Sequence, residues 1–399
     1  MSLNRDSVHA LLADLDTTRE QREELYIHFH RHPELSMQEF GTADRIRTEL
    51  EAAGIDVRAV GRTGLVAVIA NEDGPTVAMR ADIDALPITE DSGKPYAATG
   101  DVAHACGHDV HIISLLSACL AFHRHRDAWS GTFIGVFQPG EEAAAGARSM
   151  VEAGIAEIMP TPDVYLGQHV LGTIPGGHVG TNPGPTLSAA ASIRVTVHGT
   201  GTHGSMPEKG VDPVVLAASI VLRLQTIVAR EVSPTDVAVV TVGALQAGSK
   251  SNIIPASAEL LINTRAYDED VEKHLHAAIE RIVRAECAAS RSPREPEFEY
   301  YDQYPVTDND ADVTAAVRES FDAWFGDRSQ DLAPVSASED FTVIPDALGV
   351  PYTYWGLGGF VDQAAAPGNH NPAFAPDLQP TVDTGLAAIV VAASTWLTR

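Results

Sequence analysis

One cysteine, three histidines and two adjacent glutamates form a set of side chains that could hold divalent metal ions. In chain order they are Cys106, His108, Glu141, Glu142, His169 and His370. Thiolate, imidazole and carboxylate are the protein ligands that bind zinc and the other first-row divalent metals. A hydrolytic metal site also needs a base that does not bind the metal, and two neighbouring glutamates can divide these tasks. The set therefore predicts a hydrolytic metal centre.

Each member of the set also has a plainer structural explanation. Cys106 could be a buried thiol beside a helix-capping His108, and the Glu141–Glu142 pair could be the acidic start of a helix, which the helix dipole favours. His169 could be satisfied inside the protein, and His370 could lie in a surface turn. Short motifs often match by chance. The metal hypothesis therefore depends on whether the fold brings these residues to one place.

Further polar residues lie beside the candidate ligands. Asp82 and Asp84 follow a predicted strand and point to the same side of an extended chain, so one of them could orient a ligand. An aspartate in a turn explains either residue equally well. A metal-bound imidazole needs a carboxylate or carbonyl on its other nitrogen. We assign this supporting role to the neighbours of the cysteine segment, His104, Asp109 and His111.

Short apolar runs alternate with amphipathic segments along much of the chain. Strands are predicted at Leu65–Ala70, Thr76–Ala81, Thr132–Phe137, Val164–Gly167 and Val350–Trp355. Helices are predicted at residues 8–15, 40–50, 110–122, 145–153 and 382–396. This alternation predicts an α/β fold with a central mixed sheet flanked by helices. The candidate ligands follow strands, where open α/β sheets place their sites.

The pattern changes after a segment rich in proline and glycine at Thr181–Pro185. Beyond it, strands with period-two alternation and two long helices follow in the order β-α-β-β-α-β, which is the split βαβ arrangement of ferredoxin-like domains. We predict that residues 187–301 form an inserted α+β domain. Residues 1–186 and 302–399 would then be the two parts of one catalytic domain.

The composition favours a soluble protein with more than one domain. The chain has 399 residues, too many for one ordinary hydrophobic core. It has 54 Asp and Glu against 27 Lys and Arg, and a net charge of -27 argues against nucleic acid and anionic membranes as partners. Three cysteines are too few for a disulfide framework, which favours a cytoplasmic location. The start of the chain lacks an apolar leader, and the longest apolar run, Leu386–Ala393, is too short to cross a bilayer.

Seven motifs, spread over most of the chain, resemble those of the peptidase M20 family of metal-dependent amidohydrolases. They are His30–Leu35, Arg80–Pro87, His104–Asp109, Phe137–Glu142, His203–Pro207, Asn252–Pro255 and His370–Pro372. The chain is most similar to the group of hippurate hydrolases, N-acyl-amino-acid amidohydrolases and indole-3-acetyl-amino acid hydrolases. The resemblance implies a zinc-exopeptidase-like catalytic domain, with residues 187–301 as a lid that mediates dimers or tetramers.

The resemblance also implies a role for individual residues. The ligands of two divalent metal ions (Zn, Mn, Co or Ni) fall on Cys106, His108, Glu142, His169 and His370. Glu141 matches the general base and Asp84 the orienting aspartate. Substrate-binding residues of the lid fall on His203 and Asn252, and Arg265 is a reasonable partner for a substrate carboxylate. Asp82 stands where peptidase relatives carry a ligand histidine, so its contact with metal stays open.

The implied reaction is hydrolysis of an N-acyl amino acid to a carboxylic acid and a free amino acid. Two alternatives stay open. A dipeptidase or aminopeptidase of the same fold would need an acidic group to bind the free amine of its substrate. A protein that binds a metal or ligand without catalysis would have no need of the spare base Glu141.

Overall fold

The computed structural model describes residues 3–397, which form two compact units. Unit 1 consists of the chain up to Thr186, the segment Asp308–Pro334 and the chain from Asp340 onward. Unit 2 consists of Leu187–Thr307 and Val335–Glu339. Each unit has its own hydrophobic core.

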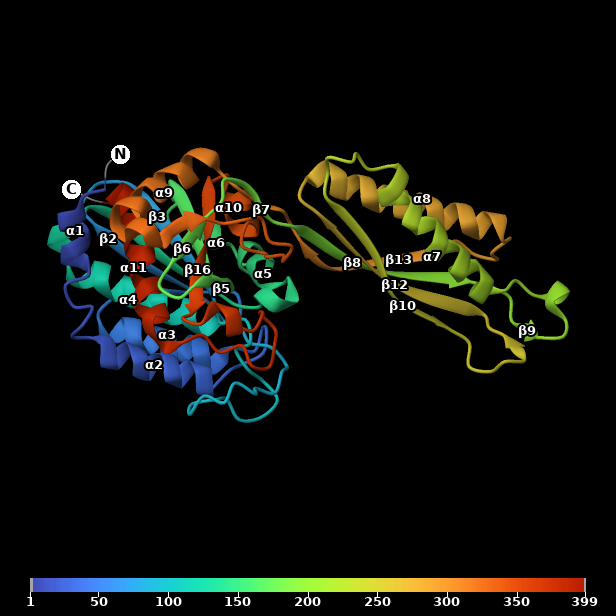
Figure 1. Cartoon of the computed structure of the whole chain (residues 1–399), viewed down its shortest axis with the longest axis horizontal. Helices are drawn as coiled ribbons and strands as arrows, with labels where there is room; N and C mark the ends of the chain where they lie inside the picture. The colour runs from blue at the N-terminus through green and yellow to red at the C-terminus, as the bar shows by residue number, and fades with distance from the viewer. Residues whose placement is uncertain (1–2, 398–399) are drawn as a thin grey trace. The chain divides into compact units, whose positions relative to one another are not determined.

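Unit 1 is built on an eight-stranded mixed sheet (Figure 1). In spatial order its strands are β1 (Asp56–Val60), β2 (Gly64–Asn71), β4 (Gly131–Gln138), β3 (Thr76–Asp82), β5 (Val164–Pro175), β16 (Tyr352–Phe360), β6 (Val179–Thr181) and β15 (Ser329–Asp331). The four central strands β4, β3, β5 and β16 are parallel, whereas β2 and β6 run antiparallel to their inner neighbours. Parallel strands are buried on both faces, which explains their continuous apolar runs.

Helices cover both faces of this sheet. They are α1 (Arg5–Leu11), α2 (Arg19–Arg31), α3 (Phe40–Ala52), α4 (His108–Arg124), α5 (Gly146–Glu152), α6 (Ile155–Ile158), α9 (Ala311–Phe325), α10 (Val343–Leu348) and α11 (Leu378–Leu397). On one face α4 packs against α11, and Phe122 of α4 stacks on Phe133 of β4. On the other face α5 packs against α10, and Met150 of α5 meets Gly64 of β2. The predicted α/β architecture with a central mixed sheet is confirmed.

Unit 2 contains a four-stranded antiparallel sheet in the order β10-β12-β8-β13. Its main elements are β8 (Ala189–His198), α7 (Pro213–Arg230), β10 (Ala238–Ala247), β12 (Ser257–Ala266), α8 (Glu269–Ala289) and β13 (Glu297–Tyr304). Apolar residues of the strands and helices alternate toward a shared core, and Figure 1 shows α7 and α8 lying along the sheet. The order β-α-β-β-α-β and the strand order are those of a ferredoxin-like domain.

Short elements complete the two units. They are β7 (Gly184–Leu187), β9 (Thr202–His203), β11 (Ile253–Ile254), β14 (Thr307–Asn309) and the 3₁₀ turns at Arg126–Ala128, Glu141–Ala143, Pro207–Lys209, Gly326–Arg328 and Gln363–Ala365. In unit 2, β9 pairs with β11 and places His203 opposite Ile253.

Several elements were not predicted from the sequence, among them α2, α9 and β1. The apolar stripe of α2 is interrupted because Arg22 and His30 lie buried in it beside Tyr26 and Phe29. Strand β5 also runs further than predicted. It continues past Gly167 because residues 170 and 171 pair with β16, so His169 lies within the strand and not at its end.

Two helices, α7 and α11, are long and apolar enough by composition to cross a membrane. The run Leu386–Ala393 therefore belongs to a longer apolar segment than the sequence prediction assumed. In α11, 83% of the apolar window is buried inside the structure, so core packing accounts for its composition. In α7 the buried residues lie on one face, against the sheet of unit 2.

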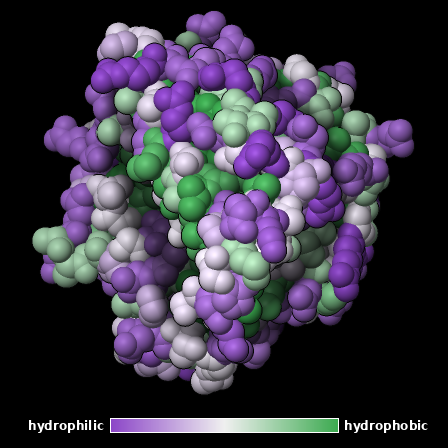
Figure 2. Space-filling model, turned by 90° about the vertical axis from the view of Figure 1, so that its right-hand side faces the viewer, coloured by the Kyte–Doolittle hydropathy of each residue, from purple (hydrophilic) through white to green (hydrophobic). Residues whose placement is uncertain are grey.

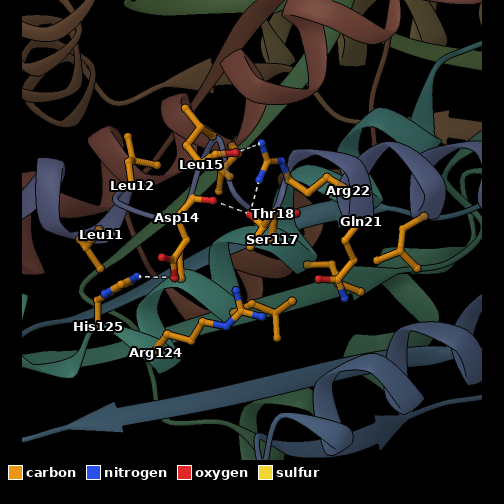
Figure 3. Close-up of a pocket in the computed structure, with 15 residues that line it drawn as sticks. Leu11, Leu12, Asp14, Leu15, Thr18, Gln21, Arg22, Ser117, Arg124 and His125 are labelled. Atoms are coloured by element: carbon orange, nitrogen blue, oxygen red, sulfur yellow. Dashed lines mark hydrogen bonds and ion pairs between the residues drawn. The ribbon is translucent and has the colours of Figure 1, made fainter.

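The molecular surface is mainly hydrophilic on the face drawn in Figure 2, with hydrophobic side chains gathered near its centre. Beneath the surface of unit 1, a hollow of about 30 Å³ lies between α1, α2, α4 and α11 (Figure 3). Leucines line it together with Arg22, whose Nη2 donates to the Leu15 carbonyl at 2.6 Å. A hollow of this size holds about one water molecule, and none of the candidate ligands lines it.

Candidate metal centre

The structure brings the six candidate residues of unit 1 together at the carboxyl-terminal side of the parallel strands. Cys106 precedes α4 and His108 is its first residue. Glu141 and Glu142 lie in the 3₁₀ turn after β4, and His169 lies in β5. His370 lies in the loop between β16 and α11. Parallel strands and their connections thus collect residues that are far apart in the sequence.

Two groups of three ligand atoms share the sulfur of Cys106. Cys106, His108 and His169 form one group, and Cys106, Glu142 and His370 form the other, with all ligand atoms of a group within 4.8 Å of one another. The Cys106 Sγ to His169 Nε2 distance is 3.4 Å, and the His370 Nε2 to Glu142 Oε1 distance is 3.3 Å. A thiolate shared by two groups of ligands is the arrangement that a bridging ligand between two cations requires.

Asp84 fixes the orientation of His108. Nδ1 of His108 lies 3.0 Å from the Asp84 carbonyl and 3.2 Å from its carboxylate, so it carries the proton and donates to both. The other nitrogen, Nε2, faces the cluster and can offer a lone pair to a cation once its proton has left. The Asp84 carboxylate also accepts the backbone N–H of Glu142 at 3.0 Å. One aspartate therefore positions two of the candidate ligands.

Two glycines let the backbone approach the cluster closely. Gly107 has a φ of 82°, and a side chain there would lie 2.4 Å from Val170. Gly140 has a φ of 58°, and its N–H donates to the carboxylate of Glu39 at 2.9 Å. Only glycine adopts such backbone readily. The turn at Gly140 directs the two following glutamates into the site, where Glu141 is buried.

The ring of His111 lies beside the rings of His108 and His169, and both of its nitrogens have partners. Its Nε2 accepts the backbone N–H of Val170 at 2.9 Å, so its proton is on Nδ1, which donates to Asp82 at 2.5 Å. The ring lies 5.5 Å from that of His108 and 4.7 Å from that of His169. Both nitrogens of His111 are therefore engaged, one by Asp82 and one by the backbone of Val170.

A buried arginine that the sequence prediction passed over holds Asp82. Nη1 of Arg80 donates to the Asp82 carboxylate at 2.8 Å, and Nε donates to Gln138 at 3.0 Å. Gln138 in turn donates to Asp340 at 2.6 Å. The signal was present in the sequence, because an arginine within an apolar strand must be paired. Asp82 thus has two strong partners outside the cluster, although its carboxylate also lies 3.5 Å from Nε2 of His108.

The raised pKa values of His108 and His370 reflect the negative charge of the side chains around them. Burial lowers the pKa of His108, but the charges of Asp82 and Cys106 outweigh burial and raise this pKa well above its usual value. Hydrogen bonds to Cys106 and Glu142 raise the pKa of His370 to about 10. For His169, burial and the nearby His111 lower the pKa well below its usual value. The acidic side chains therefore attract positive charge, which a cation can supply.

The residues present fit divalent metal ions. Among residues 3–397, Nε2 of His108 is buried and has no hydrogen-bond partner. Oε1 of Glu142 is also buried, and the polar atom beside it, Nε2 of His370 at 3.3 Å, belongs to another candidate ligand. Buried polar atoms are normally paired, so the unpaired nitrogen of His108 facing the cluster indicates a ligand. Thiolate, imidazole and carboxylate donors are those preferred by zinc-like metals.

A second histidine network supports the start of α4. Nδ1 of His30 lies 2.6 Å from the Asp109 carboxylate, and Nε2 lies 3.0 Å from Glu90. Hydrogen bonds to Asp109 and Glu90 overcome burial and raise the pKa of His30 to about 9. The hydrogen bond between His30 and Asp109 therefore connects α2 to α4. His104 is also buried, but neither of its ring nitrogens has a hydrogen-bond partner among residues 3–397.

The three substrate-binding candidates lie in unit 2. His203 and Asn252 are exposed and adjacent, because the N–H of Gly204 donates to the Asn252 carbonyl. Nδ1 of His203 accepts the N–H of Ser205 at 3.1 Å. Arg265 is half-buried, and its Nη1 donates to the Ser336 carbonyl and the Ser338 hydroxyl. Part of the Arg265 guanidinium is thus engaged within unit 2.

Residues 78–392 match the model of peptidase family M20/M25/M40. The chain belongs to this family. It is 35% identical over 369 residues to an N-acetyl-L-cysteine deacetylase of Bacillus subtilis (strain 168), covering 91% of this chain and 85% of the relative. The resemblance inferred from the sequence motifs is confirmed.

Solved structures of this family share the fold. A putative aminohydrolase from methicillin-resistant Staphylococcus aureus has a TM-score of 0.87 and 29% identity, covering 98% of both chains. A dinuclear metal-binding peptidase of the M20 family from Bacillus subtilis has a TM-score of 0.78 and 29% identity, covering 94% of this chain and 98% of the other. Together with the ligand groups around Cys106, the latter supports a site for two divalent metals in this member of the M20 family.

Proposed function

We propose that this M20 family member hydrolyses the amide bond of N-acyl amino acids, giving a carboxylic acid and a free amino acid. One observation carries the proposal. The two groups of ligands that share Cys106 do not include Glu141, which forms a further group with His108 and Glu142; its buried carboxylate lies 4.0 Å from Nε2 of His108. A spare base beside a complete ligand set is what hydrolysis requires. The similarity to an N-acetyl-L-cysteine deacetylase supports an N-acyl amino acid as substrate.

Cys106, His108, Glu142, His169 and His370 would hold two divalent ions, for which zinc, manganese, cobalt and nickel all suit the donor set. When bound, such ions polarise the amide carbonyl and lower the pKa of a water molecule. Asp84 positions the imidazole of His108 and the backbone of Glu142 through the hydrogen bonds described above. We therefore assign Asp84 to positioning the ligands.

Glu141 acts as the general base and then as the acid. Its carboxylate accepts a proton from the attacking water and passes it to the nitrogen of the leaving amine, so that one residue serves both steps. Burial within a ligand cluster keeps the carboxylate close to the reacting atoms. A general base of this kind contributes about 10²–10⁴-fold to the rate.

His203 is suited to stabilise the oxyanion. Because the N–H of Ser205 can only donate, Nδ1 of His203 is an acceptor and the ring proton lies on Nε2. This nitrogen can then donate to the developing negative charge, as one donor of an oxyanion hole does. Asn252 beside it offers an amide to the substrate, and the remaining donors of Arg265 suit a substrate carboxylate.

Unit 2 would act as the lid and as the dimer interface. Strand β10 is the edge of its sheet, and apolar side chains are exposed on β10 and α7: Val239, Leu245, Val214, Val215, Leu222 and Val228. An exposed apolar edge strand invites pairing with another chain. A second copy with the same surface would cover both faces about a two-fold axis. The three free cysteines are compatible with action in the cytoplasm.

The deciding experiment is a substrate screen with metal-reconstituted protein. N-acetyl, N-benzoyl and indole-3-acetyl amino acids should be hydrolysed, with acyl and amino parts varied separately. The free dipeptide matched to each N-acetyl substrate is the control. Faster turnover of the dipeptides would favour a dipeptidase or aminopeptidase. Absence of turnover with every metal would indicate a protein that binds a metal or ligand without catalysis.

A further inference from the structure

We infer that Asn369 is a positioning residue that holds the Cys106 thiolate by an N–H···S hydrogen bond and joins three ligand-bearing segments; the inference rests on the proposed function. The side-chain nitrogen of Asn369 lies 3.7 Å from Sγ of Cys106 and 3.3 Å from the carbonyl of the same residue. It also lies 3.2 Å from the carbonyl of Val170. All three partners are acceptors, which assigns the amide orientation with the NH₂ group toward them.

Two donors serve three acceptors. An amide nitrogen has two hydrogens, so one N–H faces Val170 and the other is shared between the carbonyl and the sulfur of Cys106. The Val170 carbonyl also accepts Nδ1–H of His169 at 2.8 Å, which fills its two lone pairs. Asn369 therefore acts on Cys106 directly and on His169 through a shared carbonyl.

The third segment is the one that carries Asn369 itself. The neighbouring His370 has a left-handed backbone with a φ of 67°, a conformation that is strained for a residue with a side chain. Its N–H donates to the Ala105 carbonyl at 2.7 Å, next to Cys106. The turn at residues 368–371 is thus bound to the cysteine segment by both backbone and side chain. Such a strained residue persists because its surroundings fix it.

A hydrogen bond to a thiolate changes the ligand itself. A donor near the sulfur stabilises its lone pairs, as hydrogen bonds to metal-bound sulfur do in redox sites. Without the bond, the sulfur electrons lie higher in energy and are transferred more easily to a metal. This predicts a spectroscopic effect that a loss of packing alone does not produce.

The test uses metal-free full-length protein loaded with Co²⁺, whose thiolate charge-transfer absorption reports on the sulfur. Cys106→Ser should abolish this band, which identifies its source. Asn369→Leu, similar in size but without donors, should move the band to longer wavelength and weaken Co²⁺ binding about 10–100-fold, the range for residues that orient ligands. Asn371→Ala is the matched control. Asn371 lies in the same turn, and its side-chain oxygen accepts the backbone N–H of Ala373.

Each outcome is decisive. An unchanged band in folded Asn369→Leu overturns the inference, even if affinity falls, because the role would then be packing alone. If Asn369→Leu does not fold, Asn369→Asp carries the test, since its oxygens cannot donate and should weaken Co²⁺ binding while Asn371→Ala stays like the wild type. Equal affinity of Asn369→Asp and wild type would overturn the inference. A wild-type band that Cys106→Ser does not remove would overturn the ligand set as well.

Discussion

Asp84 and His108 are joined twice, because Nδ1 of the imidazole donates to both the carbonyl and the carboxylate of the aspartate. This pair of bonds decides which nitrogen of His108 faces the other ligands. The same carboxylate accepts the N–H of Glu142, so the bonds couple the end of β3 to the turn after β4. The geometry of the centre is therefore set by residues around the ligands as much as by the ligands.

The two adjacent glutamates should respond differently to the same substitution. Glu141→Gln keeps size but cannot accept a proton, so kcat should fall at least about 10²–10⁴-fold while metal content stays unchanged. Glu142→Gln removes an anionic ligand and should weaken metal binding about 10-fold or more, with partial recovery of activity in excess metal. Metal content and rate are measured for both variants. If Glu141→Gln loses metal and Glu142→Gln does not, Glu141 is the metal ligand and Glu142 is the base.

Metal removal should abolish activity, and metal affinity should fall as the pH is lowered. The raised pKa values of His108 and His370, the latter about 10, mean that protons occupy these ligands near neutral pH and must leave when a cation binds. Affinity should change about tenfold per pH unit for each proton displaced. Calorimetry in two buffers of different ionisation enthalpy counts the protons. An affinity independent of pH between about 6 and 8 contradicts this prediction.

His30 should stabilise the metal-free protein in a pH-dependent way. The pKa of His30 in the folded protein, about 9, is above its ordinary value of 6.5, so its contribution is complete below the ordinary value and is lost as the pH rises through about 9. The contribution is at most about 3 kcal/mol. Denaturant unfolding of wild type and His30→Gln should differ most near pH 6 and least near pH 10. A difference that does not vary with pH would show that the charge of His30 does not matter.

Removing the N–H of His203, the proposed oxyanion donor, should lower turnover more than substrate binding. His203→Phe keeps a ring of similar size without an N–H donor, and kcat should fall about 10²–10³-fold with a smaller change in KM. His274→Phe, another half-exposed ring of unit 2, is the control. Equal rates for wild type and His203→Phe would exclude His203 from the reaction.

The apolar surface of unit 2 should be needed for self-association. Val215 is 63% exposed on α7, and a charge there should shift the protein toward the monomer in analytical ultracentrifugation. Val361→Glu is the matched control, because Val361 is 65% exposed in unit 1. An unchanged sedimentation coefficient for Val215→Glu, in a range where the wild type associates, would place the interface elsewhere.

The sequence predicted the elements whose side chains follow a simple period. Strands such as β3 and β4 are buried on both faces and read as apolar runs, and the candidate ligands could be placed because they follow such runs. Helix α2 was missed because Arg22 and His30 replace apolar residues on its buried face. Their burial depends on Asp383 and Asp109, partners that local periodicity does not reveal.

The supporting contacts of the site were the least predictable part. The bond between Arg80 and Asp340 joins residues 260 positions apart, and that between Asn369 and Cys106 joins residues 263 apart. No local pattern specifies such pairs, because they depend on how the strands are ordered in the sheet. His111 is the exception, because it lies one helical turn from His108 and residues at that spacing share a helix face.

The place of β16 in the sheet determines when the centre can form during synthesis. β16 lies between β5 and β6 in the sheet, yet it begins at Tyr352, whereas β5 ends at Pro175 and β6 at Thr181. The nascent chain still lacks this central strand and His370 when Cys106, His108, Glu142 and His169 have been synthesised. All of unit 2 is synthesised before β16 and His370. The set of candidate ligands is therefore complete only near the end of translation, after the whole inserted domain has been synthesised.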